Sequence, residues 1–258
     1  MRPMSDPLFL DVGNTARKIA WRRIEGEGPE IVWLGGLRSD MLATKATHLD
    51  AFARRTGRAF TRFDYSGHGE SAGRFADGTI SAWLEDALAV LKNVVRHRPL
   101  LVGSSMGGWI SLLAARILAE EGRPPVGLVL IAPAPDFTER LMWAEFSEEI
   151  RATILREGQW SRPSAYGEPM PIARALIEDG RRHLLLDGMI DIEAPIHILQ
   201  GMADPDVPWS HAATLIERLA RTDATLTLIK DGDHRLSRPQ DLDKLVDAIE
   251  EMIATAGA

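Results

Sequence analysis

A serine with glycines two positions away on either side constrains this chain more than any other feature. The segment at 99–122, PLLVGSSMGGWISLLAARILAEEG, joins an apolar run to a helical one. Ser105 lies between Gly103 and Gly107 in the pattern Gly-x-Ser-x-Gly, whereas Ser104 has no such flanks. A nucleophile at a tight strand-to-helix turn needs small residues at these two positions, because its backbone is strained and neighbouring segments approach closely. We therefore predict that Ser105 is a nucleophile.

The rest of the chain alternates between predicted strands and helices. Two segments near the N-terminus, 8–12 and 17–24, alternate apolar and polar residues, which predicts antiparallel strands. Further along, short unbroken apolar runs are typical of strands buried on both faces. These predicted strands are 31–36, 58–65, 99–103, 126–133, 194–201 and 224–229, and the predicted helices are 41–56, 79–95, 106–121, 208–221 and 238–256. The alternation predicts an α/β fold, a mostly parallel sheet with helices on both faces.

One segment, 134–194, interrupts this alternation. It contains amphipathic helical pieces separated by glycine- and proline-rich turns, and no clear strand. We expect a core made of 1–133 and 195–258, with 134–194 inserted as a helical cap over one end of the sheet. A chain of 258 residues is long enough for a core with such an insertion. The side chains of this segment that would line a substrate pocket, or else pack as ordinary helix residues, are Trp143, Phe146, Trp160, Tyr166 and Met170.

Composition excludes several classes of protein. The chain has no cysteine, so it has no disulfide, thiolate zinc site or cysteine nucleophile. A formal net charge of −7 argues against a nucleic-acid-binding surface. No apolar run approaches the ~20 residues that span a bilayer, and the N-terminus lacks a secretory signal pattern. We expect a cytoplasmic protein, of bacterial origin by its Ala- and Arg-rich composition, without cofactor or metal, and the sequence does not indicate its oligomeric state.

A nucleophilic serine needs partners elsewhere in the chain, because its hydroxyl is a weak nucleophile without a general base and an orienting acid. The loops after the last two predicted strands supply candidates. The first loop offers Asp204 and Asp206, and the second offers His234. Both loops follow the carboxyl ends of predicted parallel strands, where sites in open α/β sheets gather. His211, in the helix beside the acid loop, is the rival to His234 as the base.

Acyl transfer also needs backbone N–H donors for the oxyanion. We expect one from Met106, directly after the nucleophile. The other is expected from Leu37, in the loop WLGGLRSD, because Gly35 and Gly36 let the backbone turn its amide inward. The alternative is that the two glycines only form a tight turn.

Five segments resemble the α/β-hydrolases, and one branch of them in particular. RFDYSGHGES, LLVGSSMGGW, WSRPSAY, GMADPDVPW and DHR are similar to segments of the palmitoyl-protein thioesterase and mycophenolic acid acyl-glucuronide esterase branch, which is mitochondrial in animals and has bacterial relatives. The resemblance spans roughly residues 30–255. It implies the α/β-hydrolase fold and cleavage of acyl thioesters and carboxylic esters through an acyl-enzyme. It places the nucleophile, acid and base on Ser105, Asp204 and His234, and Asp204 also matches the Asp-x-x-Val-Pro pattern of hydrolase acid loops.

The chain departs from that branch at Leu37 and Arg38, where the branch has tyrosine and leucine. Arg38 would either contact a carboxylate on the leaving group, such as a glucuronate, or face solvent. Two other functions stay open: another enzyme of the same fold, such as a C–C bond hydrolase or a cofactor-free peroxidase, or a ligand-binding protein that keeps the fold without chemistry. If the chain is the thioesterase or esterase that the resemblance implies, its substrate is a small acyl ester or thioester, or an acylated protein.

Overall fold

The computed structural model describes residues 6–163, 169–220 and 223–256. Within these ranges, eight strands form the main sheet in the order β1-β2-β4-β3-β5-β6-β9-β10. The first two pairings, β1 with β2 and β2 with β4, are antiparallel, and all the others are parallel. The strands are β1 (Leu8–Val12), β2 (Arg17–Ile24), β3 (Glu27–Leu34), β4 (Arg58–Phe63), β5 (Pro99–Ser104), β6 (Gly127–Ile131), β9 (Ile196–Gly201) and β10 (Ala224–Ile229). The predicted α/β architecture is confirmed.

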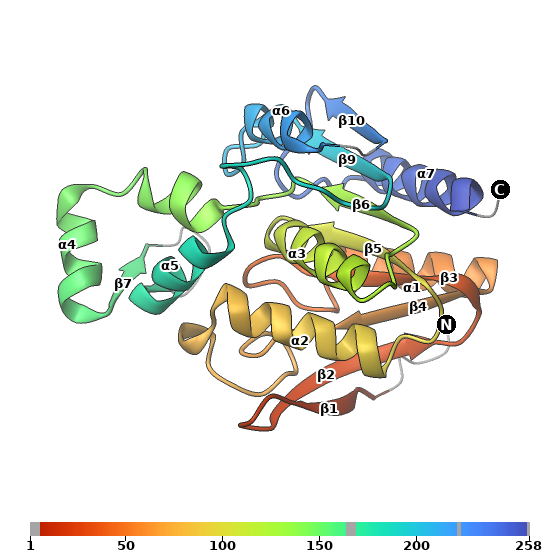
Figure 1. Ribbon diagram of the computed structural model, residues 1–258, viewed down its shortest axis with the longest axis horizontal. Coiled ribbons are helices and arrows are strands. Elements are labelled where there is room, and N and C mark those ends of the chain that lie inside the picture. The colour runs from red at the N-terminus through yellow and green to blue at the C-terminus, as the bar shows by residue number, and fades with distance from the viewer. Residues whose placement is uncertain (1–5, 164–168, 221–222, 257–258) are drawn as a thin grey trace.

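Helices cover both faces of this sheet (Figure 1). Apolar side chains of α1 and α7 pack on one face, and those of α2, α3 and α6 pack on the other. The two layers of buried side chains exclude solvent from both faces of the sheet, as the unbroken apolar runs of its strands predict. These helices are α1 (Thr44–Thr56), α2 (Ile80–Asn93), α3 (Met106–Glu120), α6 (Trp209–Arg218) and α7 (Pro239–Ala256).

The carboxylate of Asp64 explains two differences from the predicted boundaries. The helix predicted from residue 41 begins at Thr44, because the Met41 amide donates to Asp64 Oδ1 (2.6 Å) and is held outside the helix. The strand predicted to reach residue 65 ends at Phe63, because Asp64 turns away to accept the Glu70 amide (2.8 Å). One buried carboxylate therefore ties the loop after β3 to the loop after β4.

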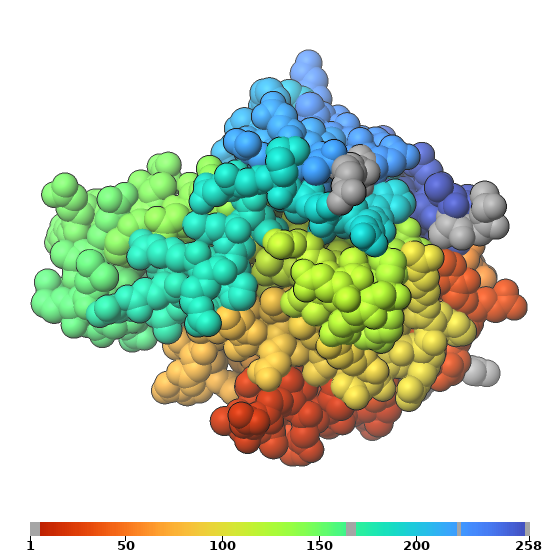
Figure 2. Space-filling view, viewed as in Figure 1, coloured from red at the N-terminus to blue at the C-terminus, as the bar shows by residue number. Residues whose placement is uncertain are grey.

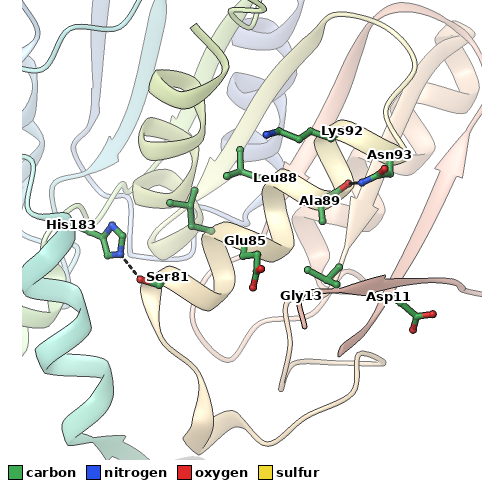
Figure 3. A pocket seen from close by; sticks show the side chains of 11 residues that line it. Asp11, Gly13, Ser81, Glu85, Leu88, Ala89, Lys92, Asn93 and His183 are labelled. Atoms are coloured by element: carbon green, nitrogen blue, oxygen red, sulfur yellow. Dashed lines mark hydrogen bonds between the residues drawn. The ribbon is translucent and has the colours of Figure 1, made fainter. Parts of the chain in front are cut away.

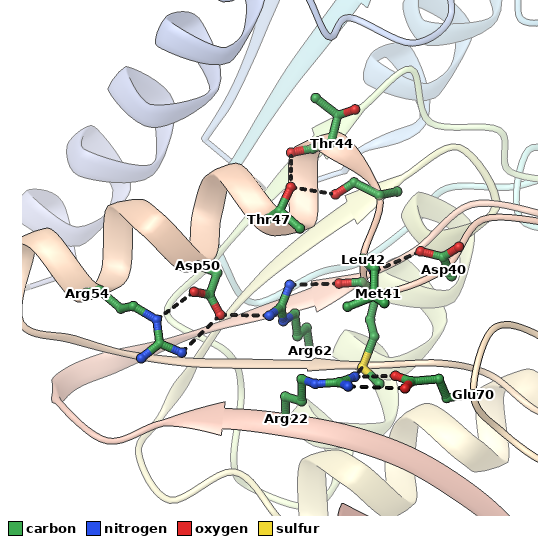
Figure 4. A network of polar contacts seen from close by, with 11 residues as sticks. Arg22, Asp40, Met41, Leu42, Thr44, Thr47, Asp50, Arg54, Arg62 and Glu70 are labelled. Carbon is green, nitrogen blue, oxygen red and sulfur yellow. Dashed lines mark hydrogen bonds and ion pairs between the residues drawn. The ribbon is translucent and has the colours of Figure 1, made fainter. Parts of the chain in front are cut away.

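Two arginines brace the same loop after β3 (Figure 4). The fully buried Arg62 donates to the Met41 carbonyl (2.9 Å) and pairs with the Asp50 carboxylate (2.8 Å). Arg22 pairs with Glu70 and contacts the Met41 sulfur. A buried guanidinium that lost such a partner would be left uncompensated, at a cost of about 3–5 kcal/mol. The network therefore fixes the far end of the loop that begins at Gly35 and Gly36.

The 134–194 segment stands out from one side of the molecule as a lobe, drawn green to cyan in Figures 1 and 2. The expectation that it contains no strand is wrong, because β7 and β8 form an antiparallel pair. Each of these strands has four residues, which is too short to show an alternating pattern in the sequence. The elements of the lobe are the π-helix η2 (Thr138–Trp143), α4 (Glu148–Glu157), β7 (Gln159–Arg162), β8 (Met170–Ala173), α5 (Arg174–Gly180) and the 3-10 helix η3 (Arg181–His183).

The lobe is joined to the sheet-bearing part of the chain at the start of α2. Asp179 accepts the amide and the hydroxyl of Ser81 (both 2.7 Å). His183 Nε2 lies 2.7 Å from the same hydroxyl, at one end of a surface groove of about 560 Å³ (Figure 3). The N-terminus of α2 is capped by Thr79, whose side chain accepts from the Ala82 amide. The polar cluster at Ser81 therefore fixes α5 and η3 against α2.

Candidate active site

The turn at Ser105 is strained and tightly held. Ser105 adopts φ 54° and ψ −116°, a conformation that L-residues rarely enter, between the end of β5 and the start of α3. Its amide donates to the Ile131 carbonyl (2.9 Å), and its carbonyl accepts from the amides of Gly108 (2.9 Å) and Ala134 (3.1 Å). These bonds hold the side chain out at the carboxyl edge of the sheet.

Close backbone approaches explain the two glycines that flank this turn. A Cβ on Gly107 would lie 2.0 Å from the carbonyl oxygen of Leu34, at the end of β3. A Cβ on Gly103 would lie 2.5 Å from the Gly107 carbonyl oxygen. No side chain fits at either position. The Gly-x-Ser-x-Gly pattern is thus required by the contact between β3, β5 and the first turn of α3.

Three side chains from distant parts of the chain form one hydrogen-bonded line. His234 Nε2 lies 3.1 Å from Ser105 Oγ, and His234 Nδ1 lies 2.8 Å from Asp204 Oδ2. Asp204 follows β9 and His234 follows β10, so both come from the carboxyl ends of parallel strands. The Asp204 side chain is fully buried, whereas a quarter of the His234 side chain is exposed (0% and 25%). The imidazole therefore bridges a buried carboxylate and a hydroxyl that is open to a pocket.

The surroundings of Asp204 keep its carboxylate ionised. Burial acts to raise the pKa of Asp204, but hydrogen bonds from His234 and from the amides of Val207 and Asp206 outweigh it, so the pKa is lowered. The two amides donate to Oδ1 from 2.9 and 2.8 Å. Gln200, fully buried in β9, adds a donor, since its Nε2 lies 3.3 Å from Asp204 Oδ2 and 3.0 Å from the Val207 carbonyl. The acid is therefore aimed at His234 by its whole loop.

The alternative candidates for the base and the acid, His211 and Asp206, do not join this line of hydrogen bonds. His211 is buried, and its Nε2 lies 2.8 Å from the Pro135 carbonyl, so it faces the start of the lobe rather than Ser105. Asp206 is exposed and does not cap α6, because the N-cap position is Pro208, without a side-chain hydrogen bond. The helix instead starts from the rigid geometry of the proline.

Asp204, Asp206 and His234 also form a group whose potential metal-ligand atoms lie within 4.8 Å of one another. Hydrogen bonds already engage the Asp204 and His234 atoms of this group. His234 Nδ1 is bound to Asp204 Oδ2, and Asp204 Oδ1 accepts two backbone amides. A cation at this position would have to displace those bonds, so the group fits an acid–base pair better than a metal centre.

The backbone places two amides beside the nucleophile. Met106 is the first residue of α3, where helix amides have no partner within the helix. Leu37 follows Gly36, whose own Cβ position lies 3.4 Å from the Ser105 Cβ. Neither the Leu37 nor the Met106 amide donates to another backbone or side-chain group in the described ranges. Both amides are therefore unpartnered within the described ranges, and their role as oxyanion donors stays a prediction.

An apolar pocket of about 600 Å³ opens at Ser105 and His234. Leu37 and Met106 also line it. Its walls come from the loop after β6, from η2, from β8 and from the acid loop, and its rim carries a few charged side chains. The apolar wall residues are Ala134, Phe137, Leu141, Met142, Met170, Pro205, Val207 and Pro208. The pocket therefore suits an apolar chain attached to a carbonyl carbon.

Of the predicted wall residues, Met170 lines this pocket. Trp160 instead packs edge-to-face on Phe146 (ring centroids 5.5 Å apart). Trp143 lies between the guanidinium groups of Arg151 and Arg181. Tyr166 lies outside the described residues. Arg38 is exposed, has φ 57° and stacks on the Phe75 ring (5.9 Å).

Some residues at the site were missed from the sequence. Phe137 is the N-cap of the π-helix that contains Leu141 and Met142, and the i→i+5 hydrogen bonds of a π-helix leave no 3.6-residue pattern in the sequence. Gln200 carried a usable signal, since it is a polar residue inside the otherwise apolar strand IHILQG, four residues before Asp204.

Comparison with known proteins agrees with this arrangement. The model of the Alpha/beta hydrolase family matches residues 31–248. The chain belongs to this family. Palmitoyl-protein thioesterase ABHD10, mitochondrial, from Mus musculus is 34% identical over 237 residues, which are 91% of this chain and 78% of that protein. The resemblance to the thioesterase branch is thereby confirmed.

Two solved structures of the family share the whole architecture. A provisionally named hydrolase from Agrobacterium vitis S4 has a TM-score of 0.92 and 48% identity, covering 98% of this chain and 100% of that one. The mouse alpha/beta hydrolase domain-containing protein 10 has a TM-score of 0.87 and 32% identity, covering 97% and 99%. Within the described ranges, none of the helices combines the length and apolar composition needed to cross a bilayer. The cytoplasmic location and the bacterial origin stay predictions, since the relatives named as palmitoyl-protein thioesterases are mitochondrial.

Replacing Gly107 with alanine should disrupt the fold at the nucleophile turn. A Cβ there meets the Leu34 carbonyl oxygen, so we expect the free energy of unfolding to fall by about 3 kcal/mol or more. The control is Gly57→Ala, where φ is +69° and no atom lies within 4 Å of the added Cβ. That variant should lose only about 1 kcal/mol, the cost of a Cβ at positive φ. Urea unfolding measures the free energy of unfolding of both variants. Equal losses in the two would contradict the steric role of the contact at Gly107.

Replacing Asp204 with asparagine should lower stability in a pH-dependent way. The pKa of folded Asp204 lies below its ordinary value of 3.8, so the ionised carboxylate stabilises the fold above that pH and stops doing so as the pH falls through the lowered pKa. We expect Asp204→Asn to lose about 2 kcal/mol at neutral pH relative to the wild type. The difference should shrink below pH 3.8. Urea unfolding of the wild type and the variant, from neutral pH to below pH 3.8, measures this difference, and Asp206→Asn is the control in the same loop. A difference in the free energy of unfolding that stays constant over this pH range would contradict the prediction.

Proposed function

We propose that this chain is a serine hydrolase that cleaves acyl thioesters and carboxylic esters through an acyl-enzyme on Ser105. The observation that carries the proposal is the line of hydrogen bonds from Ser105 through His234 to Asp204, at the inner end of an apolar pocket. A hydroxyl, an imidazole and a buried carboxylate in this order are the parts of a nucleophile that is activated by a general base. The relatives named as palmitoyl-protein thioesterases support acyl thioesters as the substrate class.

In the first step, Ser105 Oγ attacks the acyl carbon while its proton passes to His234 Nε2, 3.1 Å away. Asp204 holds the Nδ1–H of the ring and stabilises the imidazolium that forms. The carbon–sulfur or carbon–oxygen bond of the tetrahedral intermediate then breaks. The leaving thiolate or alkoxide takes the proton from His234, and the acyl group stays on Ser105.

In the second step, water reverses this sequence. His234 takes a proton from the water as its oxygen attacks the acyl-enzyme carbon, and the bond to Ser105 Oγ then breaks. The proton returns to Ser105, and the carboxylic acid leaves. In both steps the amides of Leu37 and Met106 bind the oxyanion, and losing one such donor costs on the order of 10²–10³ in rate.

The lobe has a role in this proposal. We assign 1–133 and 195–258 to the catalytic core and 134–194 to a cap that roofs the acyl pocket. Phe137 at the N-cap of η2, Met142 of η2 and Met170 of β8 would contact the acyl chain directly. Trp160 would support that wall from the strand paired with β8. Arg38 would meet a charged part of the leaving group from the rim of the site.

The test of the nucleophile is labelling by a fluorophosphonate probe. The wild type should be labelled, and Ser105→Ala should not. Ser104→Ala should keep the label, because no hydrogen bond joins its hydroxyl to His234. Turnover of a butanoyl thioester should fall by about 10⁴-fold or more in Ser105→Ala and by about 10⁴-fold in Asp204→Asn.

Two results would reject the proposal in different ways. A folded wild type that takes no label would favour a binding protein without chemistry. A wild type that is labelled but cleaves neither thioesters nor oxygen esters would reject the substrate class, and a panel that includes C–C bond substrates would then identify the reaction.

A further inference from the structure

A second pocket, of about 360 Å³, opens on the other side of the nucleophile. It shares Leu37, Ser105 and His234 with the apolar pocket, so the reacting group lies where the two pockets meet. Its other walls come from the loop after β3, the first turn of α1 and the loop after His234. The lining is largely polar, in contrast to the first pocket.

The charges of this second pocket are unbalanced. Arg38, Lys45 and Arg235 line it, against the single carboxylate of Asp40. The Asp40 carboxylate already accepts the Leu42 amide (2.8 Å). The first turn of α1 contains no acidic residue. The pocket therefore carries excess positive charge next to Ser105.

Among the residues that the structure describes, Lys45 is a cation of this pocket that lacks a nearby counter-ion. It is half-buried, and its ammonium donates to the Arg235 carbonyl, one residue after His234. The nearby carboxylates are engaged elsewhere: Asp233 accepts the amides of Arg235 and Leu236, and Asp241 pairs with an arginine of its own segment. Within the described ranges no carboxylate lies within 4.0 Å of the Lys45 ammonium. A half-buried ammonium without a counter-ion is costly unless a ligand supplies one.

We propose that this second pocket receives the leaving group, and that Lys45 makes it selective for a thiol or alcohol that carries a carboxylate or phosphate. The inference rests on the proposed function. With the acyl chain in the apolar pocket and its carbonyl carbon at Ser105, the other substituent of that carbon points to the polar side. An anionic group there would meet the half-buried Lys45 ammonium on the pocket wall and form a charge-assisted hydrogen bond with it.

The competing explanation is that Lys45 only holds the loop of His234 through the Arg235 carbonyl. The two explanations differ in a measurable way. A structural role would change hydrolysis of all substrates alike. A role in recognition changes the ratio of kcat/KM for an anionic thioester to that for a neutral one.

The experiment uses butanoyl thioesters that differ only in the leaving group. The carboxylate arm compares 3-mercaptopropanoate with its methyl ester, and the phosphate arm compares 2-mercaptoethyl phosphate with 2-mercaptoethanol. We expect the wild type to prefer the anionic member of at least one pair, and Lys45→Met to reduce that preference about tenfold, the effect of one charge-assisted hydrogen bond. Lys45→Arg should restore most of it. Lys18→Met, which removes an exposed lysine on β2, is the control and should keep the wild-type ratio.

The wild type alone provides a second measurement. Burial lowers the pKa of Lys45 to about 8. The preference for the anionic thioester should therefore decline as the pH rises through about 8, where the ammonium becomes neutral. The charged groups that face Lys45 are Asp233 and Arg235 of the base loop, Asp241 of α7, and Arg38 and Asp40 of the loop after β3. His234 serves both substrates as the shared base, so its protonation divides out of the ratio.

The outcomes separate the inference from the function on which it rests. A ratio that Lys45→Met leaves unchanged, or that falls only because all rates fall together, overturns the role of Lys45. If Lys45→Met does not fold, a wild-type ratio that stays constant through pH 8 overturns it equally. A wild type that hydrolyses neither member of either pair overturns the proposed function itself. Loss in Lys45→Met with recovery in Lys45→Arg supports the inference.

Discussion

The contact between Gly107 and the end of β3 is the constraint on which the site depends. With no side chain between them, the first turn of α3 can press against the carbonyl of Leu34. This brings the loop that begins at Gly35 beside the turn that carries Ser105. One close approach thus sets both the exposure of the hydroxyl and the position of the amides around it. The strain stored at φ 54° persists because three backbone hydrogen bonds hold the turn on either side.

The remaining parts of the site are held by buried polar groups rather than by apolar packing. Asp204 is held by two amides and by Gln200, so its loop has one arrangement. Asp64 does the same for the loop after β3. Hydrogen bonds to buried carboxylates are directional and costly to break, which makes them better suited than apolar contacts to fix loops at the end of a sheet. The sheet sets where these loops begin, and the buried carboxylates fix the conformations that the loops adopt.

Much of this could be predicted from the sequence, because the strongest signals were local. The apolar runs revealed the strands, and the glycines at 103 and 107 marked the turn, since steric exclusion at one position leaves a mark in one residue. Positions that depend on contacts between distant segments could not be predicted. The start of α1 is set by Asp64, on a different strand, and the walls of the apolar pocket are set by a π-helix. Lys45 gave no signal, because its lack of a counter-ion is a property of its neighbours in space and not of its neighbours in the chain.

The two unlike pockets that meet at Ser105 have a consequence for the order of events. Departure of a thiol or alcohol would empty the side lined by hydroxyls and charged groups, while the acyl chain still fills the apolar side. Solvent would then flow into the vacated, wettable side alone. The hydrolytic water would reach the ester carbon along the path by which the first product left, next to His234, and the hydrocarbon tail would keep every other approach dry. Polarity alone would thus impose a direction on the catalytic cycle, without any movement of the chain.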